Sequence, residues 1–382
     1  MRIPEIIKNI LCSIKGIIIV IAITILLFEI SLQIILYYNH DLARKLLYSS
    51  YLFREYRLTE IFLKNYERNL KDPSDEHFAW SDEPYEVHKT RGWTTRKNVK
   101  TFHQTNNMGH RNYRDYIYNR NQFAIVTLGD SFTFGTEAKT KDIWPILLEG
   151  KSKYYQVVNL GVGGYGIDQM YITLKETIKS YKPNIVLLAY IADDLKRSLY
   201  KFNGYEKPRF ILMNNRLINK NPYIGNVEQT YNMIKEDYDI LTKKNERKFL
   251  FPAALNNLYA ILINKFFNSL DNELEKINTR LIEEIFIICK RENAELLLIH
   301  LGSGKGLMDI NFKDKGEIFL EQYILTHKVE YIKSRELFAN ADKSWAPGHY
   351  QRQENEYLAE IIHRKIQKMS SWNNWVSNSG KK

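Results

Sequence analysis

Short, mainly apolar runs recur along this chain, and they constrain its fold more than any other feature. Three of them are Ile125–Leu128, Val157–Val158 and Ile185–Ala189, all rich in Ile, Val and Leu. Runs of this kind are typical of parallel strands that helices cover on both faces. Further strands are predicted near Leu296 and Val329, with helices near 143–149, 169–180, 274–291 and 353–369. The sequence therefore predicts an α/β fold of the flavodoxin-like type, with three layers around a central parallel sheet.

Chemically reactive groups follow these runs, at the strand ends where α/β sheets collect ligands. Gly129-Asp130-Ser131 ends the first run, which makes Ser131 a candidate nucleophile or, alternatively, a helix cap. The second run leads into Gly161-Val162-Gly163-Gly164, where glycines suit either a tight turn or backbone N–H groups facing an anionic oxygen. Asp193-Asp194 follows the third run, and His349 stands in a loop before the last predicted helix.

Taken in order, these four blocks resemble those of the SGNH (GDSL-type) hydrolase family, and the chain is similar to its membrane-anchored bacterial members. The resemblance runs from about residue 92 to 362. It implies that Ser131 is the nucleophile and that His349 is its general base. It also implies an oxyanion hole made by the N–H groups of Ser131 and Gly164 and by a side chain at position 193.

Two positions depart from the family pattern. Residue 193 is Asp where the family has Asn, and an ionised carboxylate accepts hydrogen bonds but donates none. Asp193 would serve an oxyanion only if it held a proton. The family places an Asp three residues before the histidine, and this chain has Ala346 there. Asp342 is the nearest upstream carboxylate and could orient His349; a Ser–His dyad and a backbone carbonyl as orienting group are the alternatives.

Other polar residues near these blocks are expected to have supporting roles. Asp130 and Asp194 are predicted to brace the loops, with Asp194 paired to Arg197. His300 also follows a strand, and it either contacts substrate or lies in the core. Hard cations need several convergent oxygens, which the sequence does not supply, so neither a metal nor a cofactor is expected.

The N-terminus predicts a membrane anchor. Residues 16–36 are almost wholly apolar, and about 20 such residues span a bilayer as a helix. The basic residues Arg2, Lys8 and Lys15 before this run favour a cytoplasmic N-terminus, with the rest of the chain on the periplasmic or cell-surface side. Because no small-x-small cleavage site follows, an uncleaved anchor is expected. Glu29 interrupts the run, at the outer interface or against a partner helix.

Four regions follow from these features. Residues 1–38 form the cytoplasmic tip and anchor, 39–120 a helical stalk and an extended approach segment, 121–370 the catalytic domain, and 371–382 a flexible tail. Within the approach segment, Arg111 either binds a substrate carboxylate or makes a structural salt bridge. An insertion at about 198–272 is predicted to begin with a hairpin turning at Asn214-Asn215 and to continue as a helical, aromatic-rich candidate lid.

Composition narrows the function. The net charge of +11 comes from scattered Lys and Arg, without the basic face or module that nucleic-acid binding requires. Two Cys exclude a disulfide scaffold. We therefore expect a membrane-anchored extracytoplasmic serine esterase or O-acyl transferase, the acyl group being acetyl, that acts on an acylated glycan of an envelope polysaccharide. The alternatives are a catalytically degenerate scaffold that binds glycan or serves assembly and, less favoured, a lipase.

Overall fold

A computed structural model of the chain describes residues 3–38, 62–64, 67, 84–242, 250–252, 254–255, 258, 269–302, 312–333 and 348–380. Most of the predicted stalk, part of the insertion, and both Asp342 and Ala346 lie outside the described residues.

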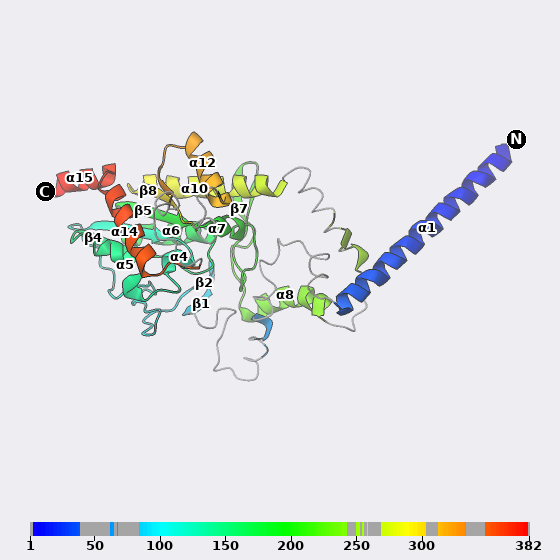
Figure 1. Ribbon diagram of the computed structural model, residues 1–382, viewed down its shortest axis with the longest axis horizontal. Coiled ribbons are helices and arrows are strands. Elements are labelled where there is room, and N and C mark those ends of the chain that lie inside the picture. Colours follow the sequence, from blue (N-terminus) through cyan, green and yellow to red (C-terminus); the bar gives the residue numbers. More distant parts are fainter. Residues whose placement is uncertain are drawn as a thin grey trace.

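The centre of the molecule is a five-stranded sheet in which every neighbouring pair is parallel (Figure 1). Its strands are β3 (Phe123–Leu128), β4 (Tyr155–Asn159), β5 (Ile185–Tyr190), β8 (Glu295–His300) and β9 (Glu330–Lys333), in the spatial order β4-β3-β5-β8-β9. All six residues of β3 and of β5 are buried, which explains why these runs carry no polar alternation. The strand order is the flavodoxin-like one, so the prediction from the apolar runs is confirmed.

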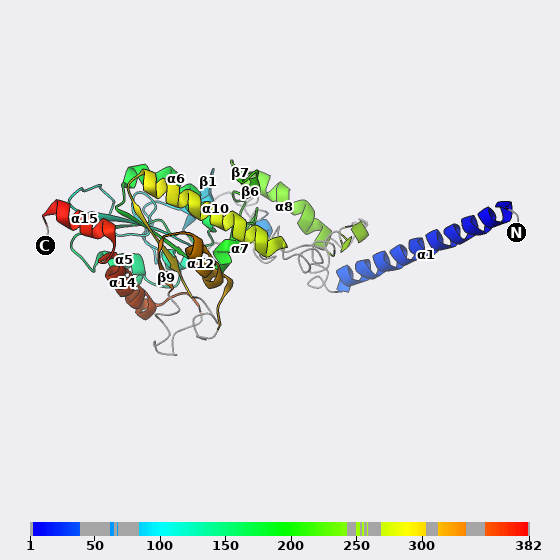
Figure 2. The same ribbon diagram turned by 90° about the horizontal axis from the view of Figure 1, so that it is seen from above.

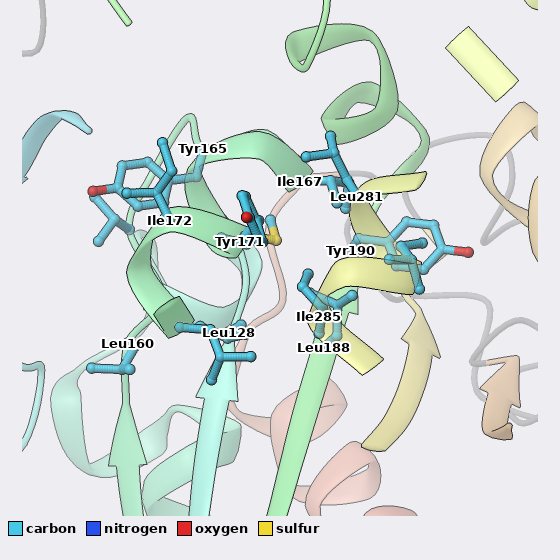
Figure 3. Packing of buried hydrophobic residues seen from close by; sticks show 14 of the residues in the cluster. Leu128, Leu160, Tyr165, Ile167, Tyr171, Ile172, Leu188, Tyr190, Leu281 and Ile285 are labelled. Atoms are coloured by element: carbon cyan, nitrogen blue, oxygen red, sulfur yellow. The ribbon is translucent and has the colours of Figure 1, made fainter. Parts of the chain in front are cut away.

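Helices cover both faces of the sheet (Figure 2). On one face α6 (Ile167–Tyr181), α10 (Ser269–Arg291) and α12 (Lys315–Thr326) contribute to one buried apolar cluster. Figure 3 shows Leu128, Leu160 and Leu188 from the strand side of this cluster beneath Ile172, Leu281 and Ile285 of the helices. On the other face α5 (Trp144–Glu149), α14 (Arg352–Ile366) and α15 (Ser370–Ser379) pack on the alternate strand residues. With one cluster on each face, the sheet lies between two layers of helices, which gives the three layers.

Two antiparallel hairpins flank the sheet. The approach segment contains β1 (Tyr85–His88) paired with β2 (Gly92–Thr95). The insertion begins with the predicted hairpin, β6 (Phe210–Met213) and β7 (Arg216–Asn219), and α8 (Val227–Thr242) follows it. Asn214 and Asn215 turn the chain with φ of 49° and 60°, the left-handed values that Asn tolerates and a tight hairpin requires. Short helices α4 (Ser131–Phe134), η1 (Thr140–Asp142) and α7 (Ala192–Arg197) complete the description.

Helices lie near both ends of the chain. Helix α1 (Ile3–Tyr38) contains a span, Ile14–Ile35, that is long and apolar enough to cross a membrane, and it extends away from the sheet (Figure 1). The flexible tail expected over 371–382 is wrong for most of its length, because α15 occupies Ser370–Ser379. Its Trp372 and Trp375 pack edge-on against Phe123 of β3, with ring centroids 5.1 and 5.9 Å away.

Candidate active site

Ser131 stands where β3 turns into α4. Asp130 is the N-cap of this short helix, and its carboxylate accepts a hydrogen bond from the Phe132 N–H at 3.0 Å. Gly135 ends the helix after one turn in the left-handed conformation, with φ of 79°. The reading of Ser131 as a helix cap is therefore wrong, since Asp130 caps the helix and Ser131 is its first residue. The short turn leaves the Ser131 side chain partly exposed at the carboxyl edge of the sheet.

A chain of hydrogen bonds joins Ser131, His349 and Glu137. The Oγ atom of Ser131 lies 2.7 Å from Nε2 of His349, and Nδ1 of the same imidazole lies 2.9 Å from a carboxylate oxygen of Glu137. In the tautomer that donates from Nδ1 to the Glu137 carboxylate, Nε2 has a lone pair facing the hydroxyl. The Phe132 ring, 4.8 Å from the imidazole centroid, packs beside the histidine. This geometry suits a serine nucleophile with its base and orienting carboxylate.

Glu137 is the residue that the sequence did not reveal. It follows Ser131 by six positions, on the loop between α4 and η1, whereas the carboxylate predicted to orient His349 was Asp342, which precedes the histidine by seven positions. The second oxygen of Glu137 accepts a hydrogen bond from Nε2 of Gln351 at 3.3 Å, so both oxygens have partners. Asp342 lies outside the described residues, and Glu137 fills the place at Nδ1 that the sequence assigned to it.

Arg111 braces the loop that carries Glu137. The guanidinium donates to the Phe134 carbonyl at 2.7 Å and also to the carbonyls of Gly135 and Ala138, on both sides of the glutamate. It lies 4.7 Å from the Phe134 ring centroid, as in a cation–π contact. Of the two alternatives given for Arg111, a substrate contact and a structural role, its exposure of only 1% favours the structural one. Its position supports a role in fixing the backbone around Glu137.

The β1–β2 hairpin and the insertion both bind the turn at Gly163-Gly164, which lies next to Ser131 and is called the glycine turn below. The Gly163 N–H donates to the Tyr85 hydroxyl at 3.0 Å, and the Trp93 indole donates to the Gly163 carbonyl at 2.9 Å. A Cβ placed on Gly163 would lie 3.8 Å from that of Ser131, so the turn adjoins the nucleophile. Gly164 has φ of 77°, which favours glycine, and its carbonyl accepts from the Asn203 amide at 2.9 Å.

Two backbone amides are available at this corner. Within the described residues, the N–H groups of Ser131 and Gly164 donate to no acceptor. Amides that are fixed in place and unengaged are what a tetrahedral oxyanion requires. Tyr85, Trp93 and Asn203, which support this turn, were not identified from the sequence as site residues.

A buried ionic cluster connects the segment after β3 with the segment after β5. Nη1 of Arg197 lies 2.9 Å from Asp130 and also contacts Asp194, and all three side chains are buried. Asp194 accepts a further hydrogen bond from the Ile191 N–H at 3.0 Å. Burial, and then the neighbouring charge of Asp130, raise the pKa of Asp194 well above its usual value. The contact between Asp194 and Arg197 is the one expected from the sequence, and it fixes the loop beside Ser131.

Asp193 occupies a different setting from the one that an oxyanion donor needs. It lies in the first turn of α7, partly exposed, with its carboxylate 3.2 Å from the Lys196 ammonium. Among the described residues, no polar contact joins Asp193 to Ser131 or His349. Its part in an oxyanion hole stays a prediction. His300 is fully buried, 3.0 Å from an Asp314 oxygen, which favours the core reading over substrate contact.

No group of three or more His, Cys, Asp or Glu side chains in the described ranges is arranged to hold a metal ion.

Comparison with known proteins gives matches to solved structures alone, since no protein-family model and no curated protein matches this sequence. The crystal structure of TesA is 11% identical and covers 64% of this chain and 98% of its own, with a TM-score of 0.36. A lipolytic protein of the G-D-S-L family from Desulfitobacterium hafniense is 13% identical and covers 64% and 99%, with a TM-score of 0.35. A catalytic mutant of Axe2, an acetylxylan esterase from Geobacillus stearothermophilus, is 11% identical and covers 65% and 95%, also at 0.35. At such scores the functional inference rests on the site residues and not on these matches.

Proposed function

We propose that this protein is a membrane-anchored, extracytoplasmic serine esterase or O-acyltransferase. The observation that carries the proposal is the chain of hydrogen bonds from the Ser131 hydroxyl through His349 to Glu137, beside two unengaged backbone amides. A serine hydroxyl needs an adjacent base to act as a nucleophile at neutral pH, and this arrangement supplies one.

The proposed reaction proceeds in two halves. Ser131 Oγ attacks the ester carbonyl while its proton passes to Nε2 of His349, and Glu137 stabilises the resulting imidazolium. The carbonyl oxygen becomes an oxyanion, which accepts hydrogen bonds from the N–H groups of Ser131 and Gly164. When the tetrahedral intermediate collapses, the C–O bond to the alcohol breaks and His349 returns its proton to the departing oxygen. This leaves an acyl-serine.

The second half decides the product. If water attacks the acyl-serine, His349 takes a proton from the water, the bond between the acyl carbon and Ser131 Oγ breaks, and His349 returns that proton to Oγ. The carboxylic acid is released and the reaction is hydrolysis. If a sugar hydroxyl attacks, the acyl group is transferred. We propose an acetylated polysaccharide of the cell envelope as the substrate, because the sequence resembles membrane-anchored SGNH hydrolases and the apolar span of α1 suits an anchor next to that compartment.

Two measurements on the full chain test the proposal. A fluorophosphonate probe is expected to label the wild type at Ser131, and p-nitrophenyl acetate is expected to be hydrolysed. Ser131→Ala should abolish both, and His349→Ala should reduce both. Ser377→Ala is the matched control, because Ser377 is an exposed serine of α15, and it should behave as the wild type.

The outcome also separates the alternatives. A folded wild type that is neither labelled nor active would contradict the esterase proposal and favour a scaffold that binds glycan or serves assembly. Faster turnover of p-nitrophenyl palmitate than of the acetate would favour a lipase. Acetylated oligosaccharide as donor, with a second oligosaccharide present, distinguishes hydrolysis from transfer by whether free acetate or a newly acetylated sugar accumulates.

A further inference from the structure

Glu29 is a buried carboxylate inside the apolar helix α1. Glu29 is 7% exposed, whereas the nearby apolar residues Leu26, Leu27 and Ile34 of the same helix are 57%, 59% and 52% exposed. One oxygen accepts hydrogen bonds from the Gln33 amide at 2.7 Å and from the Leu250 N–H at 3.0 Å. The other accepts from the N–H groups of Leu250 and Phe251, each at 2.8 Å. Glu29 thus binds the start of a helical piece that lies more than two hundred residues away in the sequence.

This contact lies within the apolar span and not beyond its end. Glu29 precedes Ile35, the last residue of the span, by six positions, or about 9 Å at the rise of an α-helix. The Phe251 ring packs edge-on against that of Phe28, with centroids 5.9 Å apart. Leu32, three positions after Glu29, and Leu250 are each only 3% exposed. Backbone N–H groups at this level need a partner because hydrocarbon offers none, and Glu29 provides it.

The piece bound by Glu29 presents an apolar face outward. We call residues 250–252, 254–255 and 258 the clamp segment. Leu250 and Ala254 face inward and are buried, whereas Leu255 and Leu258 are 52% and 50% exposed, three positions apart on a helical turn. None of the clamp segment residues is charged. Figure 1 shows this piece beside the end of α1 and apart from the central sheet.

We propose that the clamp segment contacts lipid in the extracytoplasmic leaflet beside α1, and that Glu29 holds it there. The lipid is the occupant that fits, since the exposed leucines continue the apolar surface of the membrane-spanning helix and carry no charge to repel hydrocarbon. The inference rests on the proposed anchor and is independent of the esterase chemistry. Its consequence is that the insertion, which also contributes Asn203 to the glycine turn, is tied to the membrane surface.

Depth-dependent quenching tests this directly in the full chain. Four variants in a Cys12→Ser background each carry one new cysteine, at Leu255, Leu258, Ile23 or Ile117. Each variant is labelled at this cysteine with an environment-sensitive fluorophore and reconstituted into phosphatidylcholine vesicles with bromine-labelled acyl chains. Native Cys289 stays unlabelled, because it is 1% exposed and burial raises the pKa of its thiol to about 12. Ile117, 75% exposed in the loop before β3, reports on water. We expect loss of emission at Leu255, Leu258 and Ile23, and none at Ile117.

Two variants test the part of Glu29. Glu29→Ala should abolish the quenching at Leu255 and Leu258 while leaving that at Ile23. Ser31→Ala is the matched control on the same helix, since the Ser31 hydroxyl donates to the Leu27 carbonyl one turn earlier in that helix, and it should change neither. Quenching at Ile23 without quenching at Leu255 and Leu258 would overturn the inference and leave the anchor standing. No quenching at Ile23 would contradict both the membrane anchor and the inference. Unchanged quenching at Leu255 and Leu258 in Glu29→Ala would contradict the claim that Glu29 holds the clamp segment in place. Ester hydrolysis measured on the same vesicles reports separately on the proposed chemistry.

Discussion

Replacing Glu137 by Gln removes one negative charge from the site and keeps the shape of the side chain. In the proposed reaction His349 would become an imidazolium, with Nδ1 2.9 Å from the Glu137 oxygen. Coulomb's law for that separation gives about 1.4 kcal/mol at the dielectric of water and about 6 kcal/mol at an effective dielectric near 20. The Glu137 side chain is 49% exposed and that of His349 28% exposed, so solvent screening favours the lower part of this range. We expect a loss of about 2–3 kcal/mol, or about 30- to 150-fold in kcat/KM.

The assay is hydrolysis of p-nitrophenyl acetate by the full chain, with Asp342→Ala as the matched control. Asp342→Ala should leave turnover near that of the wild type, because Glu137 already occupies the hydrogen-bonding position at Nδ1 of His349. Glu137→Ala should cost at least as much as Glu137→Gln, since the ring also loses its orienting acceptor. The reasoning would be refuted if Glu137→Gln were fully active while Asp342→Ala lost activity, which would return the orienting role to Asp342.

Three further outcomes are expected. Arg111→Lys should lower kcat by about 10- to 100-fold, because a single ammonium cannot hold the carbonyls on both sides of Glu137; adding Glu137→Gln should then cost little more, and a fully additive loss would show that Arg111 acts elsewhere. Asp193→Asn should preserve or raise kcat/KM if position 193 serves the oxyanion, and a large loss would mean that a carboxylate is specifically required. Lys207 forms a fully buried ion pair with Asp168. Lys207→Met should lower the free energy of unfolding by about 3–5 kcal/mol, because it leaves the Asp168 carboxylate buried without its cationic partner. Urea unfolding in mild detergent should find part of this loss restored when Asp168→Asn is added.

The strands were predictable because their chemistry is local. A strand that is buried on both faces consists mostly of apolar residues, so β3 and β5 could be recognised from their own residues alone. The hairpin turn at Asn214-Asn215 was equally local, because few residues tolerate two successive positive φ angles.

Glu137 was not predictable in the same way. Its carboxylate reaches His349 only because Gly135 ends α4 after one turn and because Arg111 binds the loop that follows. Nothing near Glu137 in the sequence specifies this path, since Arg111 lies more than twenty positions upstream. The structure also gave Arg111 a different part from the substrate contact considered for it.

Helix α15 was not predicted for a different reason. Trp372, Trp375 and Val376 stand at the spacing of one helical face, and all three pack on the sheet side of the helix. The signal was present in the sequence, but a polar Ser- and Asn-rich composition around it and the Lys381-Lys382 end suggested a tail. Periodicity, and not average polarity, was the informative property here.

The most direct test of the account is a structure of the full chain after reaction with a phosphonate that mimics the tetrahedral intermediate. We predict phosphorus bonded to Oγ of Ser131, with the phosphonyl oxygen about 2.7–3.1 Å from the backbone nitrogens of Ser131 and Gly164 and His349 facing the leaving side. A phosphonyl oxygen turned away from both amides, or a phosphonate attached to another residue, would contradict the central claim that these groups converge on one reacting carbonyl.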